Sequence, residues 1–169
     1  MKSLILIRHA KSSWSDPDLA DIDRPLNARG KRDAPAMGER LARRGIEPDG
    51  FVASPAKRAR KTARAIAGAI GFPNGAIEWD ARVYEASAMG LMDLVAGFDD
   101  AFDRIALVGH NPAMTELANL LGAGGIDNVP TCGIVEIEFP IHRWRDLPST
   151  PGVLTCFDYP KKPGEGVSP

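Results

Sequence analysis

The sequence predicts an α/β fold, a three-layer α/β/α sandwich with a mainly parallel central sheet. Short runs of branched apolar residues, typical of buried parallel strands, occur at 4–7 and 104–108. Between such runs, apolar side chains recur every three or four residues over stretches of about 10 to 15 residues, as they do on one face of a helix. Strands that alternate with such helices build a parallel sheet covered on both faces.

The elements of the first half follow in order along the chain. The strand at 4–7 leads into a polar loop over 12–27, and the apolar spacing of Ala34, Met37 and Leu41 predicts a helix over 29–44. A second short strand covers 49–53. Ser54-Pro55 then predicts a helix start and Gly71 its stop, because serine caps helices and proline suits the first helical position. We expect an extended segment over 76–84.

The second half repeats this alternation once and then changes character. Leu91, Leu94 and Phe98 indicate a helix, and a buried strand follows at 104–108. Asn111-Pro112 repeats the capping pattern of the earlier helix start. Beyond it, two strands are expected around 134–139 and 153–157 with no clear helix between them. We expect one domain over 1–159 and a flexible tail over 160–169, which is rich in Pro, Gly and Lys.

Composition restricts the function classes. The formal net charge of -1 gives no support to nucleic-acid binding, so an anion site has to be built locally. No apolar run approaches the roughly 18 residues that a membrane span requires. The segment before Arg8 is too short for a signal peptide, and the two cysteines show no metal-ligand spacing. We therefore expect a soluble cytoplasmic protein.

The most informative local feature is a histidine placed between cations at the end of a strand. Arg8-His9-Ala10-Lys11 directly follows the first apolar run, and the carboxyl ends of parallel strands are where open α/β sheets bind ligands. Nearby positive charge disfavours the charged form of a histidine and attracts an anion. A neutral, nucleophilic imidazole next to an anion site indicates phosphate chemistry.

Two further candidates lie near the predicted helix starts. Arg58 follows Ser54-Pro55 by one turn, and His110 precedes Asn111-Pro112. Helix N-termini at strand ends suit anions, and arginine can bind phosphate oxygens through two parallel hydrogen bonds. Each signal alone has a simpler interpretation: Arg58 is one of several cations in a run typical of a solvated helix face, and His110 fits an ordinary turn.

The motifs together resemble the histidine phosphatase superfamily, and most closely its small SixA-like phosphohistidine phosphatase branch. The resemblance covers about residues 4–122 and appears in the family's order. It rests on the segments Leu6-Ile7-Arg8-His9-Ala10-Lys11-Ser12-Ser13-Trp14, Asp23-Arg24-Pro25-Leu26-Asn27 with Gly30, Ser54-Pro55-Ala56-Lys57-Arg58-Ala59-Arg60-Lys61-Thr62-Ala63, and Leu107-Val108-Gly109-His110-Asn111-Pro112.

This resemblance implies roles for four residues. His9 is the expected nucleophile that carries a transient phosphoryl group, Arg8 and Arg58 bind the phosphate oxygens, and His110 completes the pocket. The family motif selects Arg58 from the charge run because it lies four residues after Ser54. Ser12 and Asn111, within the same motifs, are further candidate substrate-binding residues. No metal or organic cofactor is implied.

Three questions stay open from the sequence. Glu85 is the leading candidate for the acid that protonates the leaving group, equally well interpreted as a surface glutamate, and Asp93 is a weaker one. The substrate is expected to be a phosphorylated protein, as phosphohistidine, or a small-molecule phosphate such as a sugar phosphate. A non-catalytic phosphate-binding module is a further alternative.

Because Arg8 and His9 would point to opposite faces of a regular strand, we predict that the strand ends or kinks by His9.

Overall fold

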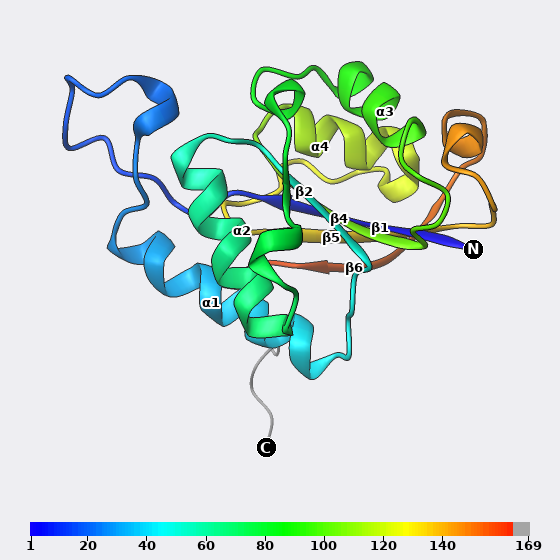
Figure 1. Cartoon of the computed structure of the whole chain (residues 1–169), viewed down its shortest axis with the longest axis horizontal. Coiled ribbons are helices and arrows are strands. Elements are labelled where there is room, and N and C mark those ends of the chain that lie inside the picture. The colour runs from blue at the N-terminus through cyan, green and yellow to red at the C-terminus, as the bar shows by residue number, and fades with distance from the viewer. Residues whose placement is uncertain (164–169) are drawn as a thin grey trace.

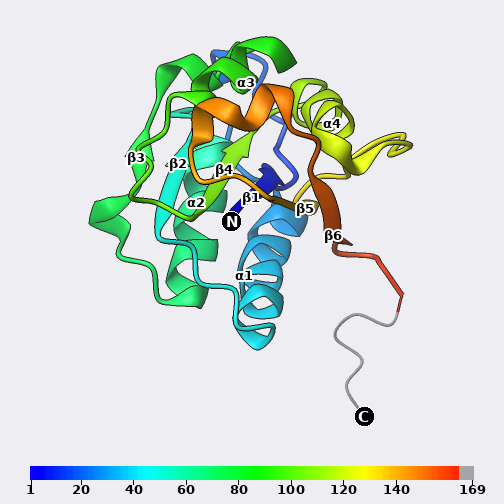
Figure 2. The same ribbon diagram turned by 90° about the vertical axis from the view of Figure 1, so that its right-hand side faces the viewer.

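The computed structural model describes residues 1–163, in which six strands form one sheet in the order β3-β2-β4-β1-β5-β6 (Figure 1). The strands are β1 (Lys2–Arg8), β2 (Gly50–Ala53), β3 (Glu78–Trp79), β4 (Arg104–Gly109), β5 (Ile134–Phe139) and β6 (Val153–Asp158). The first four run parallel, whereas β5 and β6 are antiparallel to their neighbours. Figure 2 shows β3 and β6 at opposite edges of the sheet. The predicted mainly parallel sheet is confirmed.

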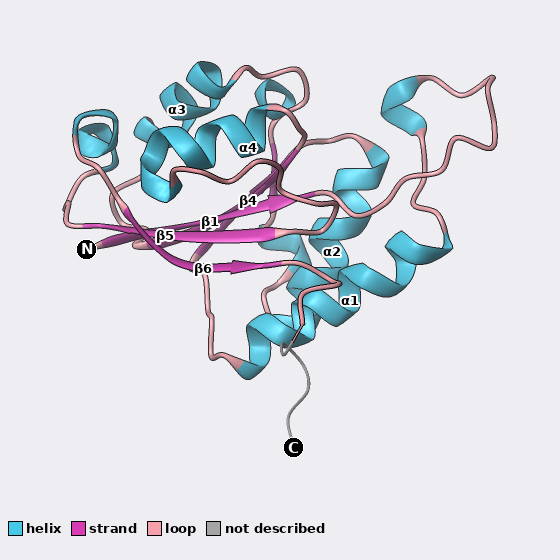
Figure 3. Ribbon diagram, turned by 180° about the vertical axis from the view of Figure 1, so that it is seen from behind, coloured by secondary structure: helices cyan, strands magenta, loops and turns pink. Residues whose placement is uncertain are grey.

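Helices cover both faces of the sheet, which confirms the predicted three-layer class (Figure 3). One face carries α1 (Ala28–Arg43) and α2 (Lys57–Ile70), and the other carries α3 (Ala88–Ala96) and α4 (Ala113–Ala118). The central strand β1 shows why a continuous apolar run was needed. Its alternate residues Leu4 and Leu6 pack with α3 and α4, while Ile5 and Ile7 pack with α1 and α2.

The strand β1 ends at Arg8, as predicted, and His9 lies just beyond it. The backbone at His9 is nevertheless fixed on both sides. Its N–H donates to the carbonyl of Gly109 at 3.0 Å, and its own carbonyl accepts from the N–H of Cys132 at 3.1 Å. Because the strand ends at Arg8, the side chain of His9 does not have to point to the opposite face of the sheet from Arg8. Its backbone nevertheless stays hydrogen-bonded on both sides.

The predicted helix starts are wrong, by two residues for α2 and by one residue for α4. The helix α2 begins at Lys57 with Ala56 as its N-cap residue, and α4 begins at Ala113 with Pro112 in that position. Instead of capping the helix, Ser54 accepts a hydrogen bond from the N–H of Ala56 at 3.2 Å, which closes a local turn before α2. The side chain of Asn111 accepts from the N–H of Thr115, inside α4.

The extended segment predicted over 76–84 is also wrong for most of its length. Only β3 pairs with the sheet, and it lies between two 3-10 turns, Asn74–Ala76 and Ala81–Val83. Asp80 ends the strand because its side chain accepts from the N–H of Arg82 at 2.9 Å and starts the second turn. Of the tail predicted over 160–169, residues 164–169 lie outside the described part of the chain.

Candidate active site

The four side chains expected to form a phosphate site come from three neighbouring elements. Arg8 ends β1 and His9 follows it, His110 directly follows β4, and Arg58 lies in the first turn of α2. Strands β1 and β4 are paired in parallel, with Arg8 opposite Gly109, so their carboxyl ends meet. The ring centroids of His9 and His110 lie 5.1 Å apart. The fold therefore brings the two histidines together, as predicted.

His9 is held in one tautomer by its own backbone neighbour. Its side chain is buried, and Nδ1 lies 2.7 Å from the carbonyl oxygen of Ala10. Because a carbonyl oxygen can only accept a hydrogen bond, Nδ1 carries the proton. The other ring nitrogen, Nε2, then keeps its lone pair and is the atom available for nucleophilic attack.

The surroundings of His9 also keep its ring neutral. Burial, together with the nearby charges of His110, Arg58 and Arg8, lowers the pKa of His9 from 6.5 to about 3, although the hydrogen bond to Ala10 opposes this shift. At neutral pH the nucleophilic form is therefore the populated one. The lowered pKa predicted from the flanking cations is found, with burial as its largest cause.

The backbone of Ala10 is itself held by α2. The N–H of Ala10 donates to Oγ1 of Thr62 at 2.9 Å, and this hydroxyl donates to the carbonyl oxygen of Arg58 at 2.8 Å. Thr62 is fully buried. Its hydroxyl therefore links the loop that orients the His9 ring to the turn of α2 that carries Arg58.

His110 is oriented by Ser54. Its Nε2 lies 2.8 Å from Oγ of Ser54, which is fully buried and accepts from the N–H of Ala56. Within residues 1–163 the Ser54 hydroxyl has no other acceptor, so it donates its proton to Nε2 of His110. Because Nε2 then accepts, the ring proton of neutral His110 is on Nδ1. Burial and the charge of Arg58 lower the pKa of His110 to about 4.

Both pocket arginines use their terminal nitrogens for contacts within the protein. Nη1 of Arg8 donates to the carbonyl of Val129 at 3.0 Å, and both Nη atoms of Arg58 donate to Asp21. In residues 1–163, Nε of Arg8, Nε of Arg58 and Nδ1 of His110 are buried without a hydrogen-bond partner. Such donors cost about 1–3 kcal/mol each, which an oxyanion could recover.

Asn111 and Ser12 lie in supporting positions. The side-chain amide of Asn111 donates to the carbonyl of Val129 at 3.0 Å, the same oxygen that accepts from Arg8. Ser12 is buried, and its hydroxyl accepts from Nη1 of Arg24 at 3.0 Å. Asn111 thus shares an acceptor with Arg8, and Ser12 contacts Arg24 directly. Direct substrate binding by Asn111 or Ser12 stays a prediction.

Glu85 and Lys11 remain apart from this arrangement. Glu85 is exposed and directly follows Tyr84, and no hydrogen bond joins its side chain to the pocket within the described residues. Its role as an acid stays a prediction. Lys11 is partly exposed, and its backbone oxygen packs so closely against Gly30 that a Cβ atom at position 30 would clash with it. This close approach explains the glycine at position 30.

Sequence reasoning did not assign roles to Asp21, Tyr84 and Thr62. Asp21 contacts Arg58 from 37 positions away, and the Tyr84 hydroxyl donates to Asp21 Oδ2 at 2.6 Å. The Tyr84 ring packs edge-on against His110, with centroids 5.6 Å apart. Arg24 and Thr62 lie within segments that resemble the family motifs, and this was the sequence signal for them. Asp21 and Tyr84 had no comparable signal.

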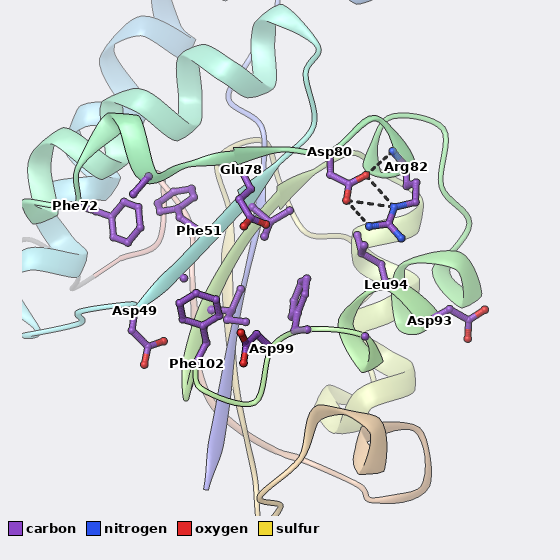
Figure 4. A pocket seen from close by; sticks show the side chains of 16 residues that line it. Asp49, Phe51, Phe72, Glu78, Asp80, Arg82, Asp93, Leu94, Asp99 and Phe102 are labelled. Atoms are coloured by element: carbon purple, nitrogen blue, oxygen red, sulfur yellow. Dashed lines mark hydrogen bonds and ion pairs between the residues drawn. The ribbon is translucent and has the colours of Figure 1, made fainter.

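A cavity elsewhere in the molecule does not overlap this site. It has a volume of about 310 Å³ and lies against the starts of β2 and β4, with Phe51, Phe72 and Phe102 among its lining residues (Figure 4). Asp80 and Arg82 pair at its edge. None of the four predicted pocket residues lines it. Within residues 1–163, no group of three or more metal-ligating side chains occurs, and no helix is long and apolar enough to cross a membrane.

Comparison with known proteins finds relatives that match nearly the whole chain. An uncharacterised protein of Mycobacterium tuberculosis is 31% identical over 165 residues, which cover 92% of this chain and 100% of the relative. A crystal structure from Agrobacterium tumefaciens, provisionally assigned as phosphohistidine phosphatase SixA, gives a TM-score of 0.79 at 28% identity and covers 94% of this chain and 98% of that one.

A second solved structure and a family model complete the comparison. The protein histidine phosphatase SixA complexed with tungstate gives a TM-score of 0.75 at 19% identity, covering 94% of this chain and 97% of that one, which shows a shared fold. The model of the histidine phosphatase superfamily (branch 1) matches residues 4–95, the segment that supplies Arg8, His9 and Arg58. With two histidines and two arginines gathered at the carboxyl ends of β1 and β4, this chain belongs to the histidine phosphatase superfamily.

Proposed function

We propose that this protein is a phosphatase that hydrolyses phosphohistidine, or a similar phosphoramidate or phosphomonoester, through a covalent phosphohistidine intermediate on His9. The observation that carries the proposal is the state of His9. Its Nδ1 proton is committed to the Ala10 carbonyl, and its pKa of about 3 keeps Nε2 unprotonated. Arg8, Arg58 and His110 lie close enough to influence that pKa, and each has a buried N–H without a partner in residues 1–163.

The first chemical step forms a bond between Nε2 of His9 and phosphorus while the bond from phosphorus to the leaving group breaks. In the resulting imidazolium the proton stays on Nδ1 and is donated in the hydrogen bond to the Ala10 carbonyl, 2.7 Å from Nδ1. In the second step the oxygen of water bonds to phosphorus, the N–P bond breaks, its electron pair returns to Nε2, and both water protons leave with the product as dihydrogen phosphate. Because the transition state of phosphoryl transfer is loose, positioning and charge stabilisation by Arg8, Arg58 and His110 supply most of the catalysis.

The protonation state of the pocket favours a good leaving group. Asp21 is the carboxylate that contacts a pocket arginine in the described residues, and its hydrogen bond from Tyr84 and its contacts with Arg58 hold its pKa well below the usual range. An ionised carboxylate has no proton to give. A phosphohistidine ring that carries a proton on its second nitrogen expels neutral imidazole, whose conjugate acid has a pKa of about 6.5, and so needs little help, whereas an alkoxide needs a proton. This supports phosphohistidine as the substrate class, and we propose that a phosphorylated protein in the cytoplasm carries it.

Trapping the intermediate tests the proposal. The protein is mixed with a labelled phosphohistidine peptide and quenched in alkali, where phosphohistidine survives, and the label on the chain is counted. We expect rapid, acid-labile labelling that disappears in His9→Ala and persists in His142→Ala, a matched control at an exposed histidine. Phosphoramidate and a panel of sugar phosphates are assayed beside it.

The outcomes separate the candidate functions. Turnover of phosphohistidine and phosphoramidate above the sugar phosphates supports the proposal. The reverse order points to a metabolite phosphatase instead. Binding of phosphate without label from any donor would identify a non-catalytic binding module and overturn the covalent mechanism.

A further inference from the structure

Asp21 is the meeting point of three hydrogen-bond donors beside the phosphate site. It lies in the turn Asp21–Asp23 of the long loop that precedes α1. Its carboxylate accepts from Nη2 of Arg58 at 2.9 Å, from the Tyr84 hydroxyl at 2.6 Å and from Nε of Arg24 at 3.1 Å. We call Asp21, Arg24, Arg58 and Tyr84 the Asp21 network. The mechanism described above does not use Asp21.

The contacts of Arg58 leave one face of its guanidinium free. Nη1 donates to the backbone oxygen of Asp21 at 2.7 Å and Nη2 to its carboxylate, so Asp21 occupies the end formed by the two terminal nitrogens. Nε is buried and has no partner within residues 1–163. Nε and the second proton of Nη2 together form the side face of the group, which matches two oxygens of one phosphate.

We propose that Asp21 is a positioning residue for the phosphatase reaction, which holds the end of the Arg58 guanidinium so that its side face is presented to the substrate phosphate. This inference rests on the proposed function for its substrate. Asp21 then keeps its contact with Arg58 while phosphate is bound. Arg58 is only 6% exposed, so fixing one end of its planar group also limits the direction of the other.

The rest of the network fixes Asp21 in turn. The Arg24 guanidinium stacks on the Trp14 ring at 3.5 Å and donates to the Ser12 hydroxyl at 3.0 Å. Tyr84 approaches the carboxylate from the turn after β3, on a different part of the chain. Because two separate segments hold Asp21, the carboxylate is pre-organised before substrate arrives.

Charge and positioning make opposite predictions for removal of Asp21. If the carboxylate merely competes with phosphate for Arg58, its removal deletes a nearby negative charge and tightens phosphate binding. If it positions Arg58, its removal frees the guanidinium and weakens binding. The direction of the change in phosphate affinity therefore decides between the two.

The experiment measures inorganic phosphate binding by calorimetry, and kcat and KM for phosphoramidate, in Asp21→Ala and Asp21→Asn. We expect Asp21→Ala to weaken phosphate binding and to lower kcat/KM by roughly 10- to 100-fold, as small misplacements in active sites do. Asn keeps an acceptor oxygen, so Asp21→Asn loses less. Asp146→Asn changes a carboxylate–arginine pair, with Arg143, that no residue of the site contacts, and stays near wild type.

A double variant shows whether Asp21 acts through Arg58. In an Arg58→Ala background, adding Asp21→Ala is expected to change phosphate affinity by less than about twofold, because the two residues form one unit. Tighter or unchanged phosphate binding in Asp21→Ala overturns the inference, as does a full additional loss in the Arg58→Ala background. Phosphate binding is measured without turnover, so a wild-type chain that binds phosphate but lacks activity would refute the proposed function separately.

Discussion

Removing the hydroxyl of Thr62 tests how the nucleophile is held. In Thr62→Val the N–H of Ala10 and the carbonyl of Arg58 both lose their contact with this hydroxyl. The shape of the side chain is nearly kept, so the change removes hydrogen bonds rather than volume. Because Thr62 is fully buried, water cannot replace the lost partner at Ala10.

The magnitude follows from these contacts. An unsatisfied buried N–H costs about 1–3 kcal/mol, which sets the expected loss in free energy of unfolding. The carbonyl of Ala10 accepts the hydrogen bond from Nδ1 of His9 at 2.7 Å, so a shift of the Ala10 backbone turns the imidazole. Misplacement of a nucleophile by about 1 Å lowers rates by up to 10²-fold, and we expect kcat/KM to fall by roughly 10- to 100-fold.

The assay compares urea unfolding and phosphoramidate kinetics for Thr62→Val, Thr62→Ser and Thr155→Val. Serine restores the hydroxyl and should recover most of the activity. Thr155 lies in β6, the edge strand on the other side of β5 from β1, and donates to the carbonyl of Glu136 at 3.1 Å. It controls for the loss of a hydroxyl alone. Full activity in folded Thr62→Val, or equal impairment in Thr62→Ser, would refute the reasoning.

Two further predictions concern pH and the leaving group. The pKa values of about 3 for His9 and about 4 for His110 lie below the unfolded value near 6.5, so unfolding takes up protons and stability is lost as pH falls below about 6.5. At pH 5 each ring contributes a loss of about 2 kcal/mol in the free energy of unfolding, measured by urea unfolding. His9→Gln should remove about half of the combined loss of the two rings, and an unchanged pH dependence in His9→Gln would contradict this origin. Glu85→Gln should leave phosphoramidate hydrolysis nearly intact but slow alkyl phosphates by up to roughly 10²-fold, whereas equal loss on both would exclude the acid role.

The sequence could predict the strand ends of this site because their signal is local. An uninterrupted apolar run requires burial on both faces, and Leu4 to Ile7 are buried accordingly. Where such a run stops, the chain leaves the sheet, which placed His9 correctly. The helix starts were less predictable, since the hydroxyl of Ser54 could cap a helix or orient His110, and the choice depends on a residue 56 positions away.

Arg58 and Asp21 mark the limit of local patterns. Periodicity alone could not distinguish Arg58 from the other cations of its run, and the family motif was needed to select it. Asp21 lay in a segment rich in aspartate and proline, where the sequence indicates only a polar loop. Its contacts with Arg58 and Tyr84 span 37 and 63 positions, so they arise from the assembled fold.

In the proposed mechanism, the charges of the pocket let one arrangement both bind phosphate and keep its nucleophile active. Arg8, Arg24 and Arg58 are permanent cations and Asp21 is ionised, so with both histidines neutral the site carries a net charge of about +2, matching a phosphate ester dianion. The whole chain has a formal net charge of -1, so this attraction is local. Arg8 and Arg58 also lower the pKa of His9. Neutralising either arginine would therefore weaken substrate binding and make the nucleophile easier to protonate, two losses from a single substitution.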